Sequence, residues 1–353
     1  MIAQTLRFIA CSLLLVFPLC AKEEIDPIFA EWQSRADPAI EAGLEYLARS
    51  QKPDGSFPEN WGDCTGIPAL VGMAFLSKGH MPTGDEYVST ITRCIDFVLS
   101  NQKDSGLLEK GNAGSGPMYA HNIATLFLSE LSGQVDPARQ EKIDKVLPGA
   151  LKVILEAQAV PKNDNDKGGW RYHPGSTDSD TSCSGWALMA LRSAKLNGAA
   201  VPDESIKAAV DYLKRHQNQE QGGFGYNDQN PNGKNLTGMG LLCLELSGLH
   251  NSPESIKAAD YVMNSFRNLP GTSHELYGNY YNAQGMFQLG GKYWSEYANW
   301  MYASYLARQS SEGSWNSNEA GPVYGTAIMV LAFTVPYRQL PIYQRDETVD
   351  EDF

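Results

Sequence analysis

The chain has 353 residues, of which 42% are hydrophobic and 20% charged, and it carries a formal net charge of −13. This composition is typical of a globular protein and excludes extended disorder and a membrane-embedded helical bundle. No basic cluster is present that could neutralise phosphates, so the charge also excludes a nucleic-acid partner.

Residues 1–21 form the first predicted element, an export signal. Arg7 precedes an apolar run that extends from Phe8 to Leu19, and Ala21 stands before a charged stretch. About a dozen apolar residues are too few to span a bilayer and suit a cleaved secretion signal. We expect cleavage after Ala21, which removes one base and no acid, and a periplasmic or extracellular protein. Cys20 leaves a lipid anchor as the alternative.

Amphipathic stretches that end in glutamine recur through residues 22–345. Within them, apolar residues follow the i, i+3, i+4, i+7 spacing that places them on one face of a helix. Glutamine ends five of the stretches, at intervals of 51, 56, 59 and 92 residues, the last of which is about two periods. The five stretches are Ala39–Gln51, Ser89–Gln102, Val146–Gln158, Ser205–Gln217 and Tyr293–Gln309. A sixth, from Ser255 to Phe266, lacks the glutamine.

A second kind of stretch follows each turn and is apolar on nearly all sides, which predicts a buried helix. These stretches are Thr65–Leu76, His121–Leu131, Gly185–Ala194, Thr237–Leu246, Asn282–Leu289 and Tyr324–Phe333. The sequence therefore predicts an all-α protein of six helical hairpins, with an inner ring of six helices inside an outer ring of six. An open superhelical stack is the alternative, but such solenoids have shorter repeats and polar caps at both ends.

The turns between the two kinds of helix share a motif. The turns at Gln51 and Gln309 read QKPDGSF and QSSEGSW, and the segments at Gly168 and Gly222 read GGW and GGFGY. Glycine permits a tight exit from the outer helix, an aromatic ring can pack across the helix end, and the glutamine amide can satisfy free backbone groups. We interpret the motif as a structural clamp without a catalytic role.

These turns resemble the glutamine–tryptophan motifs of squalene-hopene and oxidosqualene cyclases, and the hairpin repeat resembles the ring of protein prenyltransferase β subunits. The resemblance covers the chain from about Ala39 to Tyr343 and implies a single α/α toroid. It also implies a central funnel, lined by the starts of the inner helices and the turns before them. A squalene cyclase resembles two such domains, so this chain matches only one of them.

Asp178 and Asp180 are the candidate catalytic acids. They precede an inner helix in the segment DSDTS, which resembles the D-x-D-D cluster of triterpene cyclases, although Thr181 stands where the last aspartate would be. The resemblance implies that Asp180 donates a proton to an alkene or epoxide, with Asp178 as its acidic neighbour. Burial or a neighbouring carboxylate can keep such a carboxyl protonated. The alternative is that these residues only cap the helix.

Further candidates lie at the same end of other inner helices. His121 could orient an acid or exchange protons, or it could be a structural residue. Aromatic rings could stabilise a carbocation or stack on a sugar. The candidate substrate-binding residues of this kind are Trp61, Tyr119, Trp186, Tyr281 and Tyr324.

The sequence predicts no metal and no cofactor. The prenyltransferase zinc pattern D-x-C is not matched, because Asp63 directly precedes Cys64, and Cys183 lies three residues after Asp180. The cysteines beyond the signal are widely spaced, so we expect small buried side chains, with one disulfide left open. Residues 346–353 form an acidic tail.

Three functions fit these predictions. The first is an exported terpenoid-cyclase-like protein that binds or cyclises a polyprenyl or triterpene lipid. The second is a carbohydrate-active toroid, either a lyase or a hydrolase, and the third is a non-catalytic interaction protein. A dry aromatic pocket with Asp180 at one end would favour the lipid, and an open carboxylate-lined groove would favour a carbohydrate. A funnel filled by side chains would favour the interaction protein.

Overall fold

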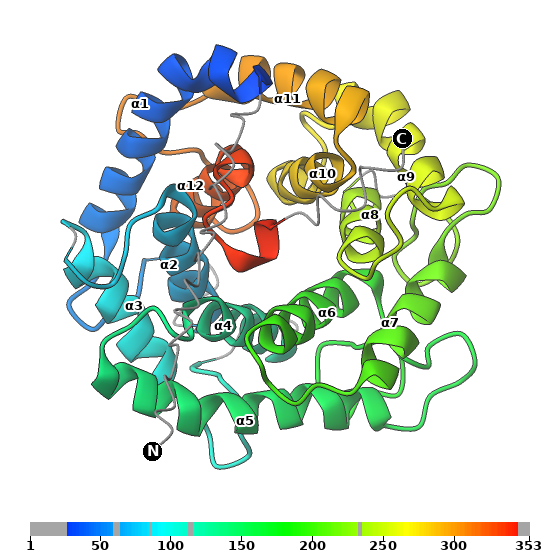
Figure 1. The fold of residues 1–353 in the computed structure, drawn as a ribbon, viewed down its shortest axis with the longest axis horizontal. Coiled ribbons are helices and arrows are strands. Elements are labelled where there is room, and N and C mark those ends of the chain that lie inside the picture. Colours follow the sequence, from blue (N-terminus) through cyan, green and yellow to red (C-terminus); the bar gives the residue numbers. More distant parts are fainter. Residues whose placement is uncertain (1–26, 59–63, 85, 112–115, 232–234, 345–353) are drawn as a thin grey trace, which may run out of the picture.

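Two concentric rings of helices make up the structure, a computed structural model that describes residues 27–58, 64–84, 86–111, 116–231 and 235–344 (Figure 1). The outer helices are α1 (Pro27–Ser50), α3 (Val88–Ser100), α5 (Pro137–Ala159), α7 (Asp203–His216), α9 (Pro253–Ser265) and α11 (Gly291–Leu306). The inner helices are α2 (Gly66–Lys78), α4 (Met118–Leu131), α6 (Thr181–Leu196), α8 (Thr237–Glu245), α10 (Glu275–Leu289) and α12 (Pro322–Phe333). The predicted α/α toroid is confirmed, and the ring is closed because α1 packs against α11 and α12.

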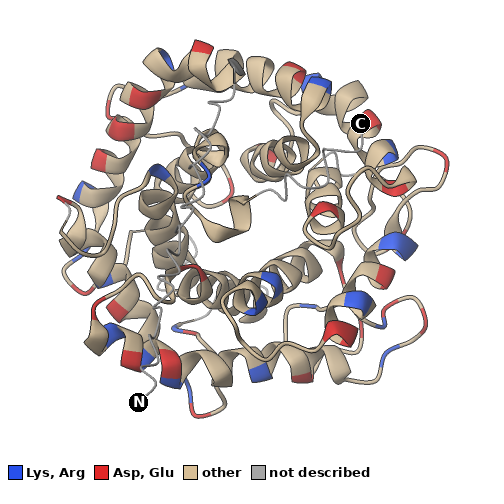
Figure 2. Cartoon of the chain, in the orientation of Figure 1, with Lys and Arg blue, Asp and Glu red and all other residues tan. Residues whose placement is uncertain are grey.

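The two kinds of helix differ as their sequences predict. In α3 one face is buried, including Ile91, Cys94, Ile95 and Val98, whereas α2 is buried along almost its whole length. Acidic and basic residues accordingly lie mainly on the outer helices and the loops (Figure 2). The inner ring is therefore the hydrophobic core, and the outer ring shields it from water.

Helices α1 and α5 begin earlier than predicted, at Pro27 and Pro137. In α5 the side chain of Asp136 accepts hydrogen bonds from two backbone N–H groups of the first turn, and a proline follows it directly. This is a strong helix start, because proline at the first position fits the helix and the aspartate satisfies free donors. The amphipathic pattern alone missed the first turns of both helices.

The five turn glutamines join neighbouring repeats by donating hydrogen bonds to main-chain carbonyl groups. Each glutamine amide donates one hydrogen bond within its own turn, to the carbonyl oxygen of a glycine, and another to a carbonyl oxygen of the next outer helix. The pairs formed with the next helix are Gln51–Thr90, Gln102–Val146, Gln158–Ser205, Gln217–Glu254 and Gln309–Ala39, over 2.7–3.1 Å. The last pair joins the turn after α11 to α1 and so closes the ring.

A glycine in each of these turns lies against the same neighbouring helix. Gly313 has φ +91°, and a Cβ atom there would overlap the backbone carbonyl of Ala42, three residues beyond the glutamine's acceptor. The other four turns repeat this arrangement, with Gly55, Gly106, Gly168 and Gly222 against Arg93, Gly149, Ala208 and Lys257. The close approach and the left-handed backbone together require glycine.

The turn aromatics pack as predicted. The indole N–H of Trp170 donates to the carbonyl oxygen of Ile154 over 2.7 Å, and that of Trp315 donates to Tyr305 over 2.8 Å. Each ring therefore packs against the last turns of the preceding outer helix and donates a hydrogen bond to its main chain. These contacts agree with a structural role for the motif.

The last described segment, residues 334–344, crosses one end of the ring, and we call it the strap. It contains two short 3₁₀ helices, η2 (Val335–Tyr337) and η3 (Pro341–Tyr343), and its contacts reach α2, α6, α10 and α12. Figure 1 shows its red ribbon in the middle of the ring. The strap lies at the C-terminal ends of the inner helices, so the opposite end, where these helices begin, carries the candidate site.

Two further features concern the described residues as a whole. None of their helices combines the length and the apolar character needed to cross a membrane. Cys64, Cys94, Cys183 and Cys243 are buried and form no disulfide with one another, so the disulfide left open by the sequence is not formed among them.

Candidate functional site

Asp180 lies at the start of α6 and is fully buried. Its backbone is extended and pairs with Trp170, which fixes the entry into the helix. One carboxyl oxygen, Oδ1, accepts the backbone N–H of Cys183 over 2.8 Å. Asp180 is therefore the N-cap of α6, as the alternative interpretation of the sequence expected, and its other oxygen faces a second group.

That second group is the guanidinium of Arg171. Its Nη1 lies 3.1 Å from Oδ2 of Asp180, and its Nε lies 3.2 Å from Oδ2 of Asp178. The Asp178 side chain is 59% exposed, whereas that of Asp180 is inaccessible to solvent. The two acids predicted from the sequence thus share one arginine but lie in different environments.

These surroundings act on Asp180 in opposite directions. Burial raises the pKa of its carboxyl, while the Cys183 N–H and Arg171 lower it, and the result is a pKa of about 6. Burial dominates because removing a carboxylate from water is costly even when it is hydrogen-bonded. A substantial fraction of Asp180 is therefore protonated in mildly acidic solution.

Aromatic rings surround Arg171. The guanidinium carbon lies 4.5 Å from the ring centroid of Tyr172 and 5.3 Å from that of Tyr226, and Nη1 donates to the Tyr226 hydroxyl over 3.0 Å. The Tyr172 and Tyr226 hydroxyls are hydrogen-bonded to each other, and Tyr119 stacks on Tyr172 with centroids 5.8 Å apart. We call Tyr119, Arg171, Tyr172, Asp178, Asp180 and Tyr226 the mouth cluster.

Tyr119 and Tyr277 lie beside Asp180. The Tyr277 hydroxyl is 2.5 Å from that of Ser182, which joins α10 to α6. Both tyrosines retain partial exposure, yet burial raises the pKa of both phenols well above the usual range. Partial exposure among many surrounding atoms is expected for side chains that lie in a recess of the protein surface.

Below this level, aromatic side chains fill the axis of the ring. Trp186 on α6 stacks on Tyr280 and meets Tyr281 edge-on, with centroids 6.0 and 5.5 Å apart. All three are at most 2% exposed. Tyr324, on α12, is also buried and lies near Tyr280. The predicted residues Trp186, Tyr281 and Tyr324 therefore come together as core below the mouth cluster.

His121 does not join this group, and its predicted role near the acid needs correction. Its Nδ1 accepts the backbone N–H of Leu108 over 2.9 Å, and its Nε2 lies 3.1 Å from the carbonyl oxygen of Ala150 on the outer helix α5. This pairing requires the neutral ring, and burial lowers its pKa to about 4. Both nitrogens are already used, so His121 is a structural residue.

The remaining predictions divide as follows. Trp61 and Asp63 lie outside the described residues. Arg171 and Tyr277 were not predicted as site residues. An arginine directly after a turn tryptophan is typical of a surface position, and a tyrosine early in a buried helix is typical of the core. The only available signal for Arg171 was its place between Trp170 and two nearby acids.

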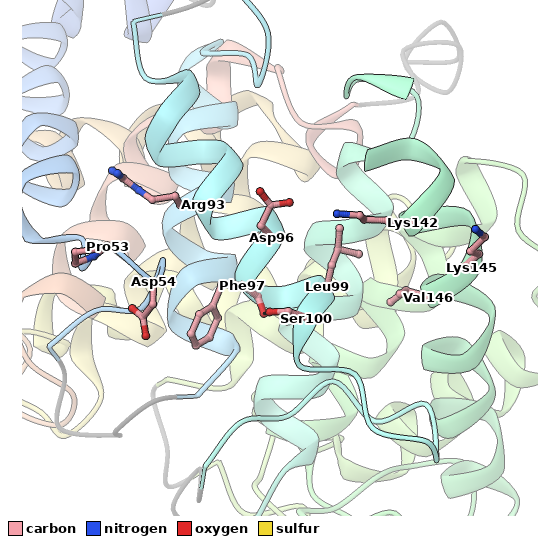
Figure 3. Close-up of a pocket in the computed structure, with 10 residues that line it drawn as sticks. All are labelled: Pro53, Asp54, Arg93, Asp96, Phe97, Leu99, Ser100, Lys142, Lys145 and Val146. Atoms are coloured by element: carbon pink, nitrogen blue, oxygen red, sulfur yellow. The ribbon is translucent and has the colours of Figure 1, made fainter. Parts of the chain in front are cut away.

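Two cavities lie away from the mouth cluster. The larger, of about 630 Å³, lies between α3 and α5; Figure 3 shows Arg93 and Asp96 on one wall and Lys142 and Lys145 on the other. Asp96 is engaged by Arg139 over 2.6 Å and Lys145 by Glu141 over 2.6 Å. The smaller cavity, of about 260 Å³, lies between the starts of α10 and α12 and includes Glu275 and Arg308.

In the parts of the chain that the structure describes, no three His, Cys, Asp or Glu side chains gather as metal ligands. The acids of the mouth cluster form ion pairs with Arg171.

Comparisons with known proteins give the fold. No protein-family model and no curated protein sequence matches the chain. Among solved structures, it is similar to the GH76A α-1,6-mannanase of Salegentibacter sp. HEL1_6, with a TM-score of 0.57 and 14% identity over 86% of this chain and 99% of that one. It is also similar to the type II terpene cyclase MstE_D109N from Scytonema in complex with geranylgeranyl dihydroxybenzoate, with a TM-score of 0.56 and 12% identity over 88% and 100%.

A third structure, a reducing end xylose-releasing exo-oligoxylanase, has a TM-score of 0.57 and 12% identity over 90% of this chain and 96% of that one. All three neighbours are α/α toroid enzymes. At such low identity the similarity establishes the ring architecture, which hosts unrelated reactions.

Proposed function

We propose that the mouth cluster is the functional site of an exported, terpenoid-cyclase-like protein that binds a polyprenyl or triterpene lipid. The observation that carries this proposal is Asp180, a buried carboxyl with a pKa of about 6 beside tyrosine rings. The fold shared with a terpene cyclase supports it. We further propose that residues 1–21 direct export and that residues 346–353 form a solvated acidic tail.

The chemistry would be proton donation. Protonated Asp180 transfers its proton to an alkene carbon, where the C=C bond supplies the electron pair, or to an epoxide oxygen, where a lone pair binds the proton and the C–O bond then breaks with its electrons going to oxygen. The partly exposed rings of Tyr119 and Tyr277 stabilise the cation that forms. Arg171 stabilises the carboxylate that remains and so strengthens the acid.

The test is extraction of bound lipids and glycans from the purified protein, with identification by mass spectrometry. We expect an isoprenoid lipid to be recovered and Asp180→Asn to abolish turnover of it or change the bound species. Asparagine retains the cap of α6, so the loss would report the acid itself. Asp164→Asn is the matched control, since that side chain is 98% exposed and lies outside the mouth cluster. An unchanged bound species and unchanged turnover in Asp180→Asn would reject the proton-donor role.

A carbohydrate-active function is the second candidate, and Asp178 favours it. A buried carboxyl whose pKa is raised, beside an exposed second carboxyl, is the kind of pair that glycoside hydrolysis requires. The tyrosine faces could stack on sugar rings, and the mannanase and exo-oligoxylanase share the fold. Release of reducing ends from mannan and xylan oligosaccharides, lost in both Asp178→Asn and Asp180→Asn, would favour this function over the lipid.

A non-catalytic interaction function is supported by the filled axis of the ring. It predicts that neither lipid nor glycan is recovered and that both aspartate variants leave the chain's partners unchanged. The three functions therefore differ in the outcome of one extraction and two substitutions.

A further inference from the structure

The strap is held at the end of the ring by polar contacts to several inner helices. Thr334 Oγ1 donates to Ser77 Oγ on α2 over 2.7 Å, and the Tyr343 hydroxyl donates to the carbonyl oxygen of Leu331 on α12 over 3.1 Å. Its apolar side chains Leu340 and Ile342 are at most 2% exposed. The strap thus covers the C-terminal ends of helices from different repeats.

Glu130 is the charged group at the centre of this contact. It lies in the last turn of α4 and is fully buried. Its Oε2 accepts the backbone N–H of Ile342 over 3.1 Å, and its Oε1 is hydrogen-bonded to the Ser193 hydroxyl on α6. Among the described residues no lysine, arginine or histidine forms an ion pair with it.

Among the described residues around Glu130, no other side chain titrates near neutral pH. The strap contributes Tyr343 and α10 contributes Tyr280, and burial raises the pKa of both phenols beyond the physiological range. Helix α6 contributes Ser193, which does not titrate. Two neutral donors cannot replace the hydration of a buried carboxylate, so the ionised form is costly in the closed arrangement.

We propose that Glu130 and the strap form a pH-dependent latch, closed when Glu130 is protonated and released from the inner helices when it ionises. In the closed arrangement burial raises the pKa of Glu130 from 4.5 to about 7. After release the carboxyl is hydrated and returns towards its ordinary value. The equilibrium constant for closure is therefore highest below pH 4.5. It falls by up to about two orders of magnitude as the pH rises from 4.5 through 7.

Hydrogen exchange of the full chain, followed by mass spectrometry between pH 5 and 8.5, tests the latch. Each observed rate is divided by the intrinsic rate at the same pH, so that the protection factor reports opening. We expect protection of the Ile342 and Tyr343 amides to fall about 100-fold over this range, while Val98 in α3 stays protected. An equal loss at Val98 would mean global unfolding and would overturn the proposal.

Glu130→Gln supplies the decisive variant. Glutamine can still accept from Ile342 and donate to Ser193, but it cannot ionise, so the protection of the strap should no longer depend on pH. Glu141→Gln, at an exposed position on α5, should behave like the unsubstituted chain. A Glu130→Gln variant that keeps the original pH dependence would reject the latch.

Ser193→Ala covers the case in which Glu130→Gln does not fold. Removing the Ser193 donor makes the ionised carboxyl still less favourable in the closed arrangement, so protection of the Ile342 and Tyr343 amides should fall by more between pH 5 and 8.5 than it does in the unsubstituted chain. An equal or smaller fall would contradict the proposal.

Discussion

His121 makes the stability of the protein depend on pH at the scale of a single residue. Burial lowers its pKa from 6.5 in the unfolded chain to about 4 in the fold. Its contribution to stability is therefore fully present above pH 6.5 and is lost as the pH falls towards 4, by about 3 kcal/mol in total. Urea unfolding of the chain and of His121→Gln at pH 7 and pH 4.5 should show the difference between them shrinking at the lower pH. A constant difference would contradict the neutral, backbone-paired ring.

Asp180 separates capping from acid chemistry. Asp180→Ala removes the acceptor for the Cys183 N–H and leaves Arg171 with one fewer partner, so we expect the free energy of unfolding to fall by roughly 1–3 kcal/mol. Asp180→Asn keeps the acceptor and should lose less. The measurement is denaturant unfolding of both variants at pH 7. Equal losses would mean that the charge on Asp180, and not its cap, stabilises the start of α6.

At the scale of the elements, the glutamine–glycine turns should control how repeats join. Gly313→Ala places a Cβ on a residue with φ +91° and against the carbonyl of Ala42, so we expect at least about 2 kcal/mol of destabilisation. Gly133→Ala is the matched control, because its φ is +87° but nothing lies within 4 Å of the added Cβ. Thermal unfolding should separate the two. A similar loss in both would mean that the backbone conformation, not contact with α1, requires the glycine.

At the scale of the whole molecule, the ring should be independent of disulfides. The four described cysteines form no disulfide with one another and are buried in four different repeats. Closure instead depends on packing of α1 against α11 and α12 and on the bond from Gln309 to Ala39. We expect a reducing agent to leave the melting temperature unchanged, whereas Gln309→Ala should lower it because two hydrogen bonds are lost. A melting temperature that falls on reduction would contradict this account.

Much of this architecture could be predicted from the sequence, since helical periodicity and the repeated turn motif are local signals. Ring closure, the clamping turns and the acids before α6 belong to that part. The partners of Asp180 could not be predicted, because Arg171 and Tyr226 lie in different turns and meet only after folding. The sequence also did not distinguish a funnel-facing His121 from one that faces α5, since both fit the start of a buried helix. The strap was missed for a similar reason: its polar partners, Glu130 and Ser193, read as ordinary helix ends.

In the sequence, the repeat can be recognised in the turns but not in the outer helices that the turns contact. The turn contacts explain this difference. The donor side needs a glutamine and a glycine, whereas the acceptor that recurs at all five joints is a main-chain carbonyl, supplied by Thr90, Val146, Ser205, Glu254 and Ala39. An acceptor of this kind makes no demand on side-chain identity. An outer helix can therefore exchange nearly all of its residues while the joint to its neighbour is retained. A ring built in this way can persist between proteins that share only 12–14% of their residues.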